Sequence, residues 1–248
     1  GALDPEEPRP PHVTAAARAA SYLYGTDRRD EADWILARAE RFARYPGAAD
    51  TTSLPWLHHA RSWRTLLEGD PVASLHHEEL SAEAFDHTGD VRNATYIRVG
   101  LAHAYRDVGA HARAEALLRE LLPITERLGI ERVTLGAKHT LATVLPYRGA
   151  HEEARRLAGE AAAGFVADGD VRMTGAVRAE LSRILAIGGD LAGAEVEARA
   201  AAGMQDGLRT SQAYALGVLS YVHLLQGKPH EALAMAQAAL QIHAEVGA

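Results

Sequence analysis

The stretch LAHAYRDVGAHARAEALL, residues 101–118, places a glycine in the middle of an otherwise alanine- and leucine-rich helical sequence. Glycine in the interior of an α-helix costs about 1 kcal/mol relative to alanine. Just past the end of a helix, where the backbone turns left-handed, glycine is instead the least costly residue. Gly109 therefore either weakens one long helix or separates two shorter ones, and the positions of the other glycines decide between these alternatives.

Two series of glycines recur along the chain at a spacing close to 40 residues. The first consists of Gly69, Gly109, Gly149, Gly189 and Gly227, and the second of Gly89, Gly129, Gly169, Gly207 and Gly247. Because the series alternate, each interval has room for one helix of about 15 to 17 residues and a turn. Asp90, Asp170 and Asp190 directly follow glycines and are candidate helix N-caps. Gly109 is thus predicted to end a helix.

Small residues recur in phase with the glycines. Alanine or serine stands five residues after each glycine of the first series, as Ala114 does, and a small residue such as Ala102 stands seven residues before. We expect two antiparallel helices to approach closely at these positions. The pattern predicts helix pairs at residues 12–46, 53–89, 92–129, 132–169, 172–207 and 210–247, which together form a single solenoid over 12–248. Residues 1–11, proline-rich and acidic, are expected to be a linker or the edge of a fragment of a larger protein.

Composition restricts the location, the partners and the fold class that are expected for the protein. The 248-residue sequence has no cysteine, which excludes disulfides and fits a reducing compartment, so a cytoplasmic location is expected. The formal net charge of -7 argues against nucleic acid as the main partner. No stretch approaches the roughly 18 consecutive apolar residues of a membrane span. An aromatic content of 6% beside abundant alanine favours an all-α protein.

The arrangement within residues 101–118 resembles the tetratricopeptide repeat. The matching places are taken by Leu101, Ala102, Tyr105, Gly109, Ala114 and Leu118. The period near 40 residues exceeds the usual 34, as in the extended repeats found beside bacterial signalling kinases, ATPases and transcription regulators. The resemblance implies a right-handed α-solenoid of antiparallel helix pairs that binds a protein or peptide segment, with no enzymatic activity and no cofactor.

The resemblance also implies which residues face the partner, because the first helix of each pair lines the concave groove of such a solenoid. Carried onto this sequence, the groove positions include Trp56, His59, Trp63, Tyr96, His103, Arg106, His139, Thr143, Tyr147, Arg183, Tyr214 and Tyr221. Tryptophan, tyrosine and arginine are the residues enriched at binding hot spots. The alternative is that some of these aromatic side chains pack between neighbouring repeats.

The sequence carries only weak indications of a metal-binding or ligand-binding site. The chain has 13 histidines, with adjacent pairs in WLHHARSW (56–63) and SLHHEEL (74–80), but neither stretch has the H-E-x-x-H spacing of a zinc helix. We expect solvated or groove-lining histidines and no metal. The repeated GDVR, residues 89–92 and 169–172, is expected to combine a glycine stop, an aspartate cap and an arginine paired with neighbouring acids, rather than to form a ligand-binding edge.

These observations lead to one main functional hypothesis and two others. The main one is a non-catalytic interaction module that forms the regulatory or scaffolding part of a larger bacterial signalling protein, for example beside a Ser/Thr kinase or an ATPase. The alternative is an effector-sensing domain of a transcription regulator that binds a small molecule or a peptide. An enzyme with a histidine metal site is the least favoured hypothesis, and self-association is left open.

Overall fold

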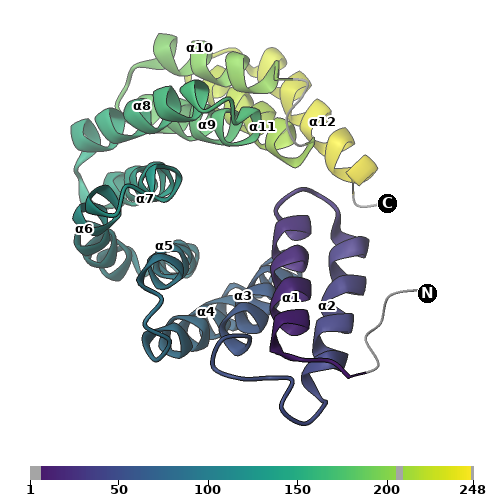
Figure 1. Ribbon diagram of the computed structural model, residues 1–248. Helices are drawn as coiled ribbons and strands as arrows, with labels where there is room; N and C mark the ends of the chain where they lie inside the picture. Colours follow the sequence, from purple (N-terminus) through teal and green to yellow (C-terminus); the bar gives the residue numbers. More distant parts are fainter. Residues whose placement is uncertain (1–6, 205–208, 247–248) are drawn as a thin grey trace. The chain divides into compact units, whose positions relative to one another are not determined.

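The computed structural model describes residues 7–204 and 209–246, and the regular elements there are all helices (Figure 1). They are α1 (Pro10–Tyr24), α2 (Arg29–Ala43), α3 (Leu54–Leu67), α4 (Pro71–Asp86), α5 (Val91–Asp107), α6 (His111–Arg127), α7 (Glu131–Val144), the 3-10 helix η1 (Leu145–Arg148), α8 (His151–Ala167), α9 (Val171–Ile187), α10 (Leu191–Ala202), α11 (Arg209–Leu225) and α12 (Pro229–Val246). The predicted all-α class is confirmed. Helix α1 begins at Pro10, so the last two residues of the expected linker form its first turn, where proline is favoured.

The chain divides into two compact units, Gly1–Leu117 and Leu118–Ala248, whose boundary lies inside α6. In the first unit α1 packs against α2 and α3 against α4. In the second unit α7 packs against α8, α9 against α10, and α11 against α12. The first helices of these pairs also touch one another, since α1 contacts α3, and α9 contacts both α7 and α11. The predicted succession of antiparallel helix pairs is confirmed.

The glycines end the helices as predicted. Gly109 follows α5 with φ +78°. The N–H of Gly109 donates to the carbonyl of Arg106 at 2.9 Å and that of Ala110 to Tyr105 at 2.8 Å, the two bonds of a Schellman motif. The other described members of the two series, Gly69, Gly89, Gly129, Gly149, Gly169, Gly189 and Gly227, have φ between +62° and +88°. Gly207 and Gly247 lie outside the described residues.

Aspartates begin the helices as predicted. The carboxylate of Asp90 accepts the backbone N–H of Asn93 at 3.1 Å, and that of Asp170 accepts the N–H of Met173 at 2.9 Å. Arg132 pairs with Asp170 and, at 3.4 Å, with Asp168. The glycine stop and the aspartate cap predicted for GDVR are therefore confirmed.

The small residues are buried between the helices of a pair. Ala102 on α5 and Ala114 on α6 have no exposed surface. Where serine takes the first of the two small positions, its hydroxyl spans the contact: Ser182 donates to the carbonyl of Ala194 at 2.7 Å, and Ser220 donates to that of Ala232 at 2.7 Å. Bonds of this length to the facing backbone leave no room for larger side chains.

We expect Ala114→Asp to lower the free energy of unfolding by several kcal/mol, because it buries a carboxylate without a partner. Ala116→Asp is the matched control, since Ala116 is exposed on the same helix. Chemical denaturation of both variants checks this. Equal stability of the two variants would contradict the assigned packing.

A second pair of variants tests the role of the left-handed glycines. Gly109→Ala should cost about 1 kcal/mol, because alanine is strained at positive φ. Gly136→Ala in α7 should instead stabilise by up to about 1 kcal/mol, since this glycine is helical and a Cβ there meets nothing within 4 Å. Thermal melts of the two variants should therefore shift in opposite directions.

Candidate functional site

The twelve predicted groove residues divide between the two compact units and differ in exposure. Trp56, His59, His139 and Thr143 are at most 7% exposed. Four tyrosines, Tyr96, Tyr147, Tyr214 and Tyr221, are between 41% and 59% exposed. The remaining four, Trp63, His103, Arg106 and Arg183, are half-buried. The buried residues contribute to packing, whereas the other eight reach the surface.

In the first unit, Trp56 of α3 is covered on several sides. Its indole meets the ring of Phe85 edge-on at a centroid distance of 5.3 Å, and the guanidinium of Arg18 lies 4.6 Å from the indole centroid. Tyr96 of α5 adds a tilted contact at 6.2 Å. Trp56 therefore joins α1, α4 and α5 to α3, which is the inter-repeat packing considered as the alternative for these aromatic residues.

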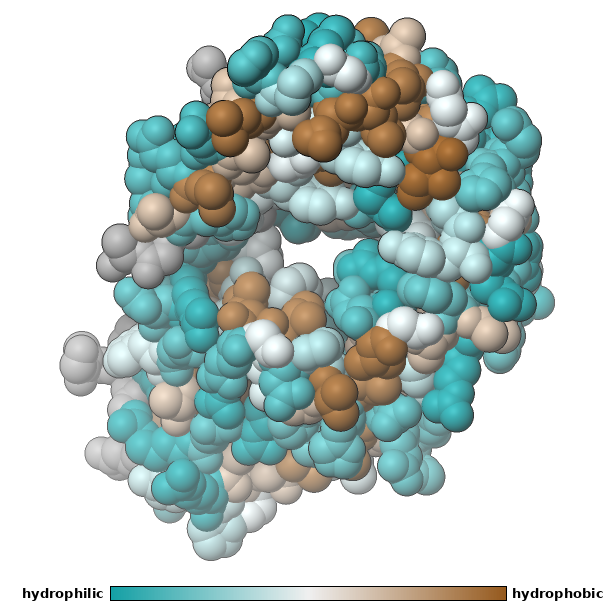
Figure 2. All heavy atoms as spheres, turned by 180° about the vertical axis from the view of Figure 1, so that it is seen from behind, coloured by the Kyte–Doolittle hydropathy of each residue, from teal (hydrophilic) through white to brown (hydrophobic). Residues whose placement is uncertain are grey.

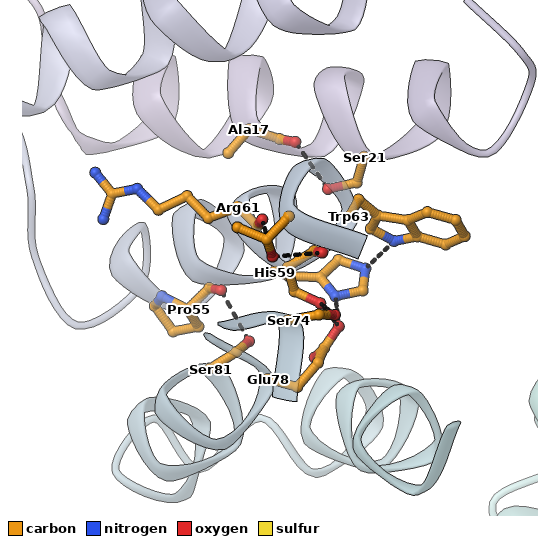
Figure 3. Close-up of polar contacts among 11 residues, drawn as sticks. Ala17, Ser21, Pro55, His59, Arg61, Trp63, Ser74, Glu78 and Ser81 are labelled. Carbon is orange, nitrogen blue, oxygen red and sulfur yellow. Dashed lines mark hydrogen bonds and ion pairs between the residues drawn. The ribbon is translucent and has the colours of Figure 1, made fainter. Parts of the chain in front are cut away.

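His59 belongs to a buried polar network between α3 and α4 (Figure 3). The indole N–H of Trp63 donates to His59 Nε2 at 3.3 Å, so the proton of this imidazole is placed on Nδ1, which donates to Glu78 at 2.8 Å. Ser62 donates to the same carboxylate oxygen at 2.9 Å and lies 3.1 Å from Ser74. In this pair, hydrogen bonds stand where other pairs have small alanine side chains. Because His59 is buried and bonded within this network, it is a structural residue.

His103 and Arg106 lie further along α5, on the face that also carries Tyr96. Arg106 donates from Nε to the neighbouring Asp107 at 2.9 Å. Both side chains are half-buried. Arg106 is thus held by its own helix.

The second unit gathers predicted residues from three first helices. Arg183 of α9 donates from Nε to Glu180 of the same helix at 2.9 Å. Tyr214 of α11 donates a short hydrogen bond to the other oxygen of Glu180. The guanidinium of Arg183 also lies 5.7 Å from the ring centroid of Tyr147, which η1 carries at the end of α7. We call Tyr147, Glu180, Arg183 and Tyr214 the Arg183 cluster.

Electrostatics keep this cluster charged. Burial raises the pKa of Glu180, but the charge of Arg183 and the hydrogen bond from Tyr214 outweigh it, so that the pKa lies below its ordinary value. His139 of α7 adds a favourable charge interaction with the carboxylate. Burial lowers the pKa of Arg183, and Glu180 more than compensates. The result is a largely buried ion pair with two tyrosines beside it.

Exposed apolar side chains continue the surface around the Arg183 cluster. Ile187 lies one turn beyond Arg183 on α9 and is 42% exposed. On α11, Tyr221 follows Tyr214 by two turns at 45% exposure, and Leu224 and Leu225 follow at 60% and 46%. Figure 2 shows hydrophobic side chains in groups separated by hydrophilic ones on the face that it draws.

Two carboxylates of these sites were missed by the sequence analysis. Glu180 stands three residues before Arg183, a spacing that places both on one face of a helix and could have indicated the pair. Glu78 stands in SLHHEEL beside Glu79, and no local signal distinguishes the buried glutamate from the exposed one.

Residues 7–204 and 209–246 lack two features that would have indicated other kinds of function. No group of three or more histidine, aspartate or glutamate side chains there is arranged to hold a metal ion. In the same residues no helix is long and apolar enough to cross a membrane.

The sequence matches the model of the tetratricopeptide repeat at residues 96–128 and 212–246. The first match covers most of the α5–α6 pair with Gly109 at its turn, and the second covers most of α11 and α12. Both stretches are tetratricopeptide repeats. No curated protein matches the chain in sequence.

Several solved structures share this tetratricopeptide repeat fold. A Rap protein complexed with competence and sporulation factor matches with a TM-score of 0.75 at 13% identity, over 96% of this chain and 78% of that one. NprR in complex with its cognate peptide NprX matches with a TM-score of 0.75 at 13% identity, over 96% and 68%. A signal transduction ATPase with a tetratricopeptide repeat sensor, from Pyrococcus horikoshii, matches with a TM-score of 0.60 at 16% identity, over 93% and 36%.

The lowered pKa of Glu180 predicts a pH-dependent contribution to stability. Because the pKa is lower in the folded chain, the unfolded chain binds more protons in acid. The contribution is therefore complete above the ordinary glutamate pKa of 4.5 and is lost as pH falls below it, through the lower pKa of the folded chain. Glu180→Gln should cost roughly 1–3 kcal/mol at pH 7 and distinctly less at pH 3.5.

Urea unfolding at the two pH values measures this difference. Glu152→Gln is the control, because the Glu152 side chain is 85% exposed beside Arg155 and should change little at either pH. A Glu180→Gln penalty that is the same at both pH values would show that the ionised carboxylate is not what stabilises the second unit.

Proposed function

We propose that this tetratricopeptide repeat chain is a non-catalytic module that binds a peptide or protein segment across the first helices of its second unit, around Arg183. The observation that carries the proposal is the Arg183 cluster with its apolar surroundings. Four large side chains on this face, Tyr147, Ile187, Tyr214 and Tyr221, are each more than 40% exposed around a partly exposed arginine. Surfaces of this composition are typical of binding hot spots.

The proposal is supported by how firmly the arginine is held. Glu180 fixes its Nε and the ring of Tyr147 lies near the guanidinium, so little side-chain entropy is left to lose on binding. Among the described residues the Nη atoms of Arg183 have no hydrogen-bond partner, which leaves them free to donate to carbonyl or carboxylate oxygens of a bound segment. The tyrosines supply rigid apolar area with a polar end.

We further propose a regulatory role in a larger bacterial signalling protein in the cytoplasm, or scaffolding within one. Support comes from the structures that share the fold: two are named as complexes with a factor or peptide, and a third as a signal transduction ATPase with a tetratricopeptide repeat sensor. The absence of cysteine agrees with a reducing compartment.

The second candidate is an effector-sensing domain of a transcription regulator. It uses the same surface, and the peptide complex of NprR favours a peptide over a small molecule as its effector. The two candidates differ in the domain that the solenoid controls, whereas the ligand surface is common to both.

A selection from random peptides displayed on phage, with the chain as bait, tests the proposed surface. Peptides that bind the unaltered chain should bind Arg183→Met at least tenfold more weakly, a loss of about 1.4 kcal/mol or more. Arg178→Met is the matched control, because Arg178 lies on the same helix but pairs with Glu197 of α10 at 2.9 Å. Fluorescence anisotropy of the labelled peptides gives the affinities.

Two results would contradict the proposal. One is a selection that yields no saturable binder, and the other is a set of binders whose affinity is the same for Arg183→Met as for Arg178→Met. Circular dichroism of both variants establishes that they are folded, so that a loss of binding reports on the surface.

A further inference from the structure

Two histidines of the first unit face each other across the α3–α4 pair, apart from the surface proposed above. His58 of α3 and His77 of α4 have their Nδ1 atoms 3.5 Å apart. Their rings are tilted by 34° with centroids 5.7 Å apart. A good hydrogen bond to nitrogen or oxygen has a heavy-atom distance of about 2.7–3.2 Å, so this separation is long for a direct bond.

The separation fits a shared metal ion instead. Zinc binds imidazole nitrogen at about 2.0–2.1 Å with tetrahedral angles, which places two ligand nitrogens about 3.3–3.4 Å apart. The two Nδ1 atoms thus need to move by only a few tenths of an ångström. We propose that His58 and His77 bind a divalent transition-metal ion of the zinc type through their Nδ1 atoms and so join α3 to α4.

The two imidazoles are in the chemical form that binds metal. Burial, together with the charges of Arg61 and His77, lowers the pKa of His58 to about 4. Burial and Arg61 likewise lower the pKa of His77. Both rings are therefore neutral at pH 7, and metal ligation requires the neutral ring. Both are only half-buried, so an ion can reach them from solvent.

The neighbouring charges do not prevent a cation from binding. Arg61 is the positive group that lowers the pKa of both histidines most, and it donates to Glu40 at 2.9 Å, which offsets its charge. Glu40 also lies 3.9 Å from Arg64. His76 is exposed, and its ring centroid lies 5.8 Å from that of His77. Water, or His76 after a rotation of its side chain, would complete the coordination.

Such an ion would lie beside the buried network of Glu78, because His58 and His77 adjoin His59 and Glu78 in the sequence. It would add a bond between the same two helices that this network connects. The site would then stabilise the first unit in proportion to the concentration of free metal, since an ion that binds only the folded chain shifts the unfolding equilibrium.

Titration of the metal-free chain with zinc chloride by calorimetry tests the proposal at pH 7. We expect one zinc ion per chain, a binding constant at least tenfold weaker in His77→Gln, and a melting temperature that rises with zinc only when the site is intact. His87→Gln is the matched control, because His87 is exposed at the end of the same helix, and it should behave like the unaltered chain.

A measurement on the unaltered chain keeps the test independent of whether the variant folds. In nitrogen NMR spectra of the histidine rings, zinc should shift the Nδ1 resonances of two histidines while their Nε2 resonances move less. The proposal is overturned if zinc does not bind saturably, if His77→Gln binds it as tightly as His87→Gln, or if no pair of Nδ1 resonances responds. None of these results depends on whether the Arg183 surface binds peptides.

Discussion

The left-handed backbone that follows most of the described helices is the constraint on which the rest of the structure depends. A helix that stops at Gly109 can turn back at once, because the next two N–H groups bond to the carbonyls that the helix leaves free. The aspartate caps start the following helix within one or two residues. Helix length, and with it the register of every helix against its partner, is thus set by where the glycines stand.

That register brings the small residues together. Ala102 and Ala114 are both fully buried at constant distances in sequence from Gly109, and the same distances place Ser182 against Ala194 and Ser220 against Ala232. In the α3–α4 pair both small positions are serine, and the hydroxyls join His59 and Glu78 in a polar network. Such a network is favourable only while its members have hydrogen-bond partners. Loss of one partner would therefore destabilise this pair in a way that has no counterpart in the pairs that use alanine.

The same register gives the first helices a common face. In the second unit, α9 lies between α7 and α11, so the side chains of Tyr147, Arg183 and Tyr214 meet although they are more than 30 residues apart in sequence. Glu180 lies between the arginine and the tyrosine and orients both. In the first unit the equivalent face is filled by Trp56 and by the network of His59, so the two units present different chemistry on equivalent helices.

The glycine spacing and the caps were sufficient to predict the fold, because helix ends depend on a few neighbouring residues and on the steric freedom of glycine. The exposure of the site residues was not predictable in this way. Trp56, Tyr96 and Tyr214 hold equivalent places in their repeats, yet they are 6%, 42% and 41% exposed. Trp56 differs because Arg18 and Phe85, from other helices, cover its ring.

The contacts of Arg183 depend on how each helix is rotated about its own axis. The position of His58 opposite His77 depends on the same rotation. Packing between helices sets that rotation, so only the tertiary structure decides it. The sequence by itself determined where each helix stops, because that choice is made within a single turn of the backbone.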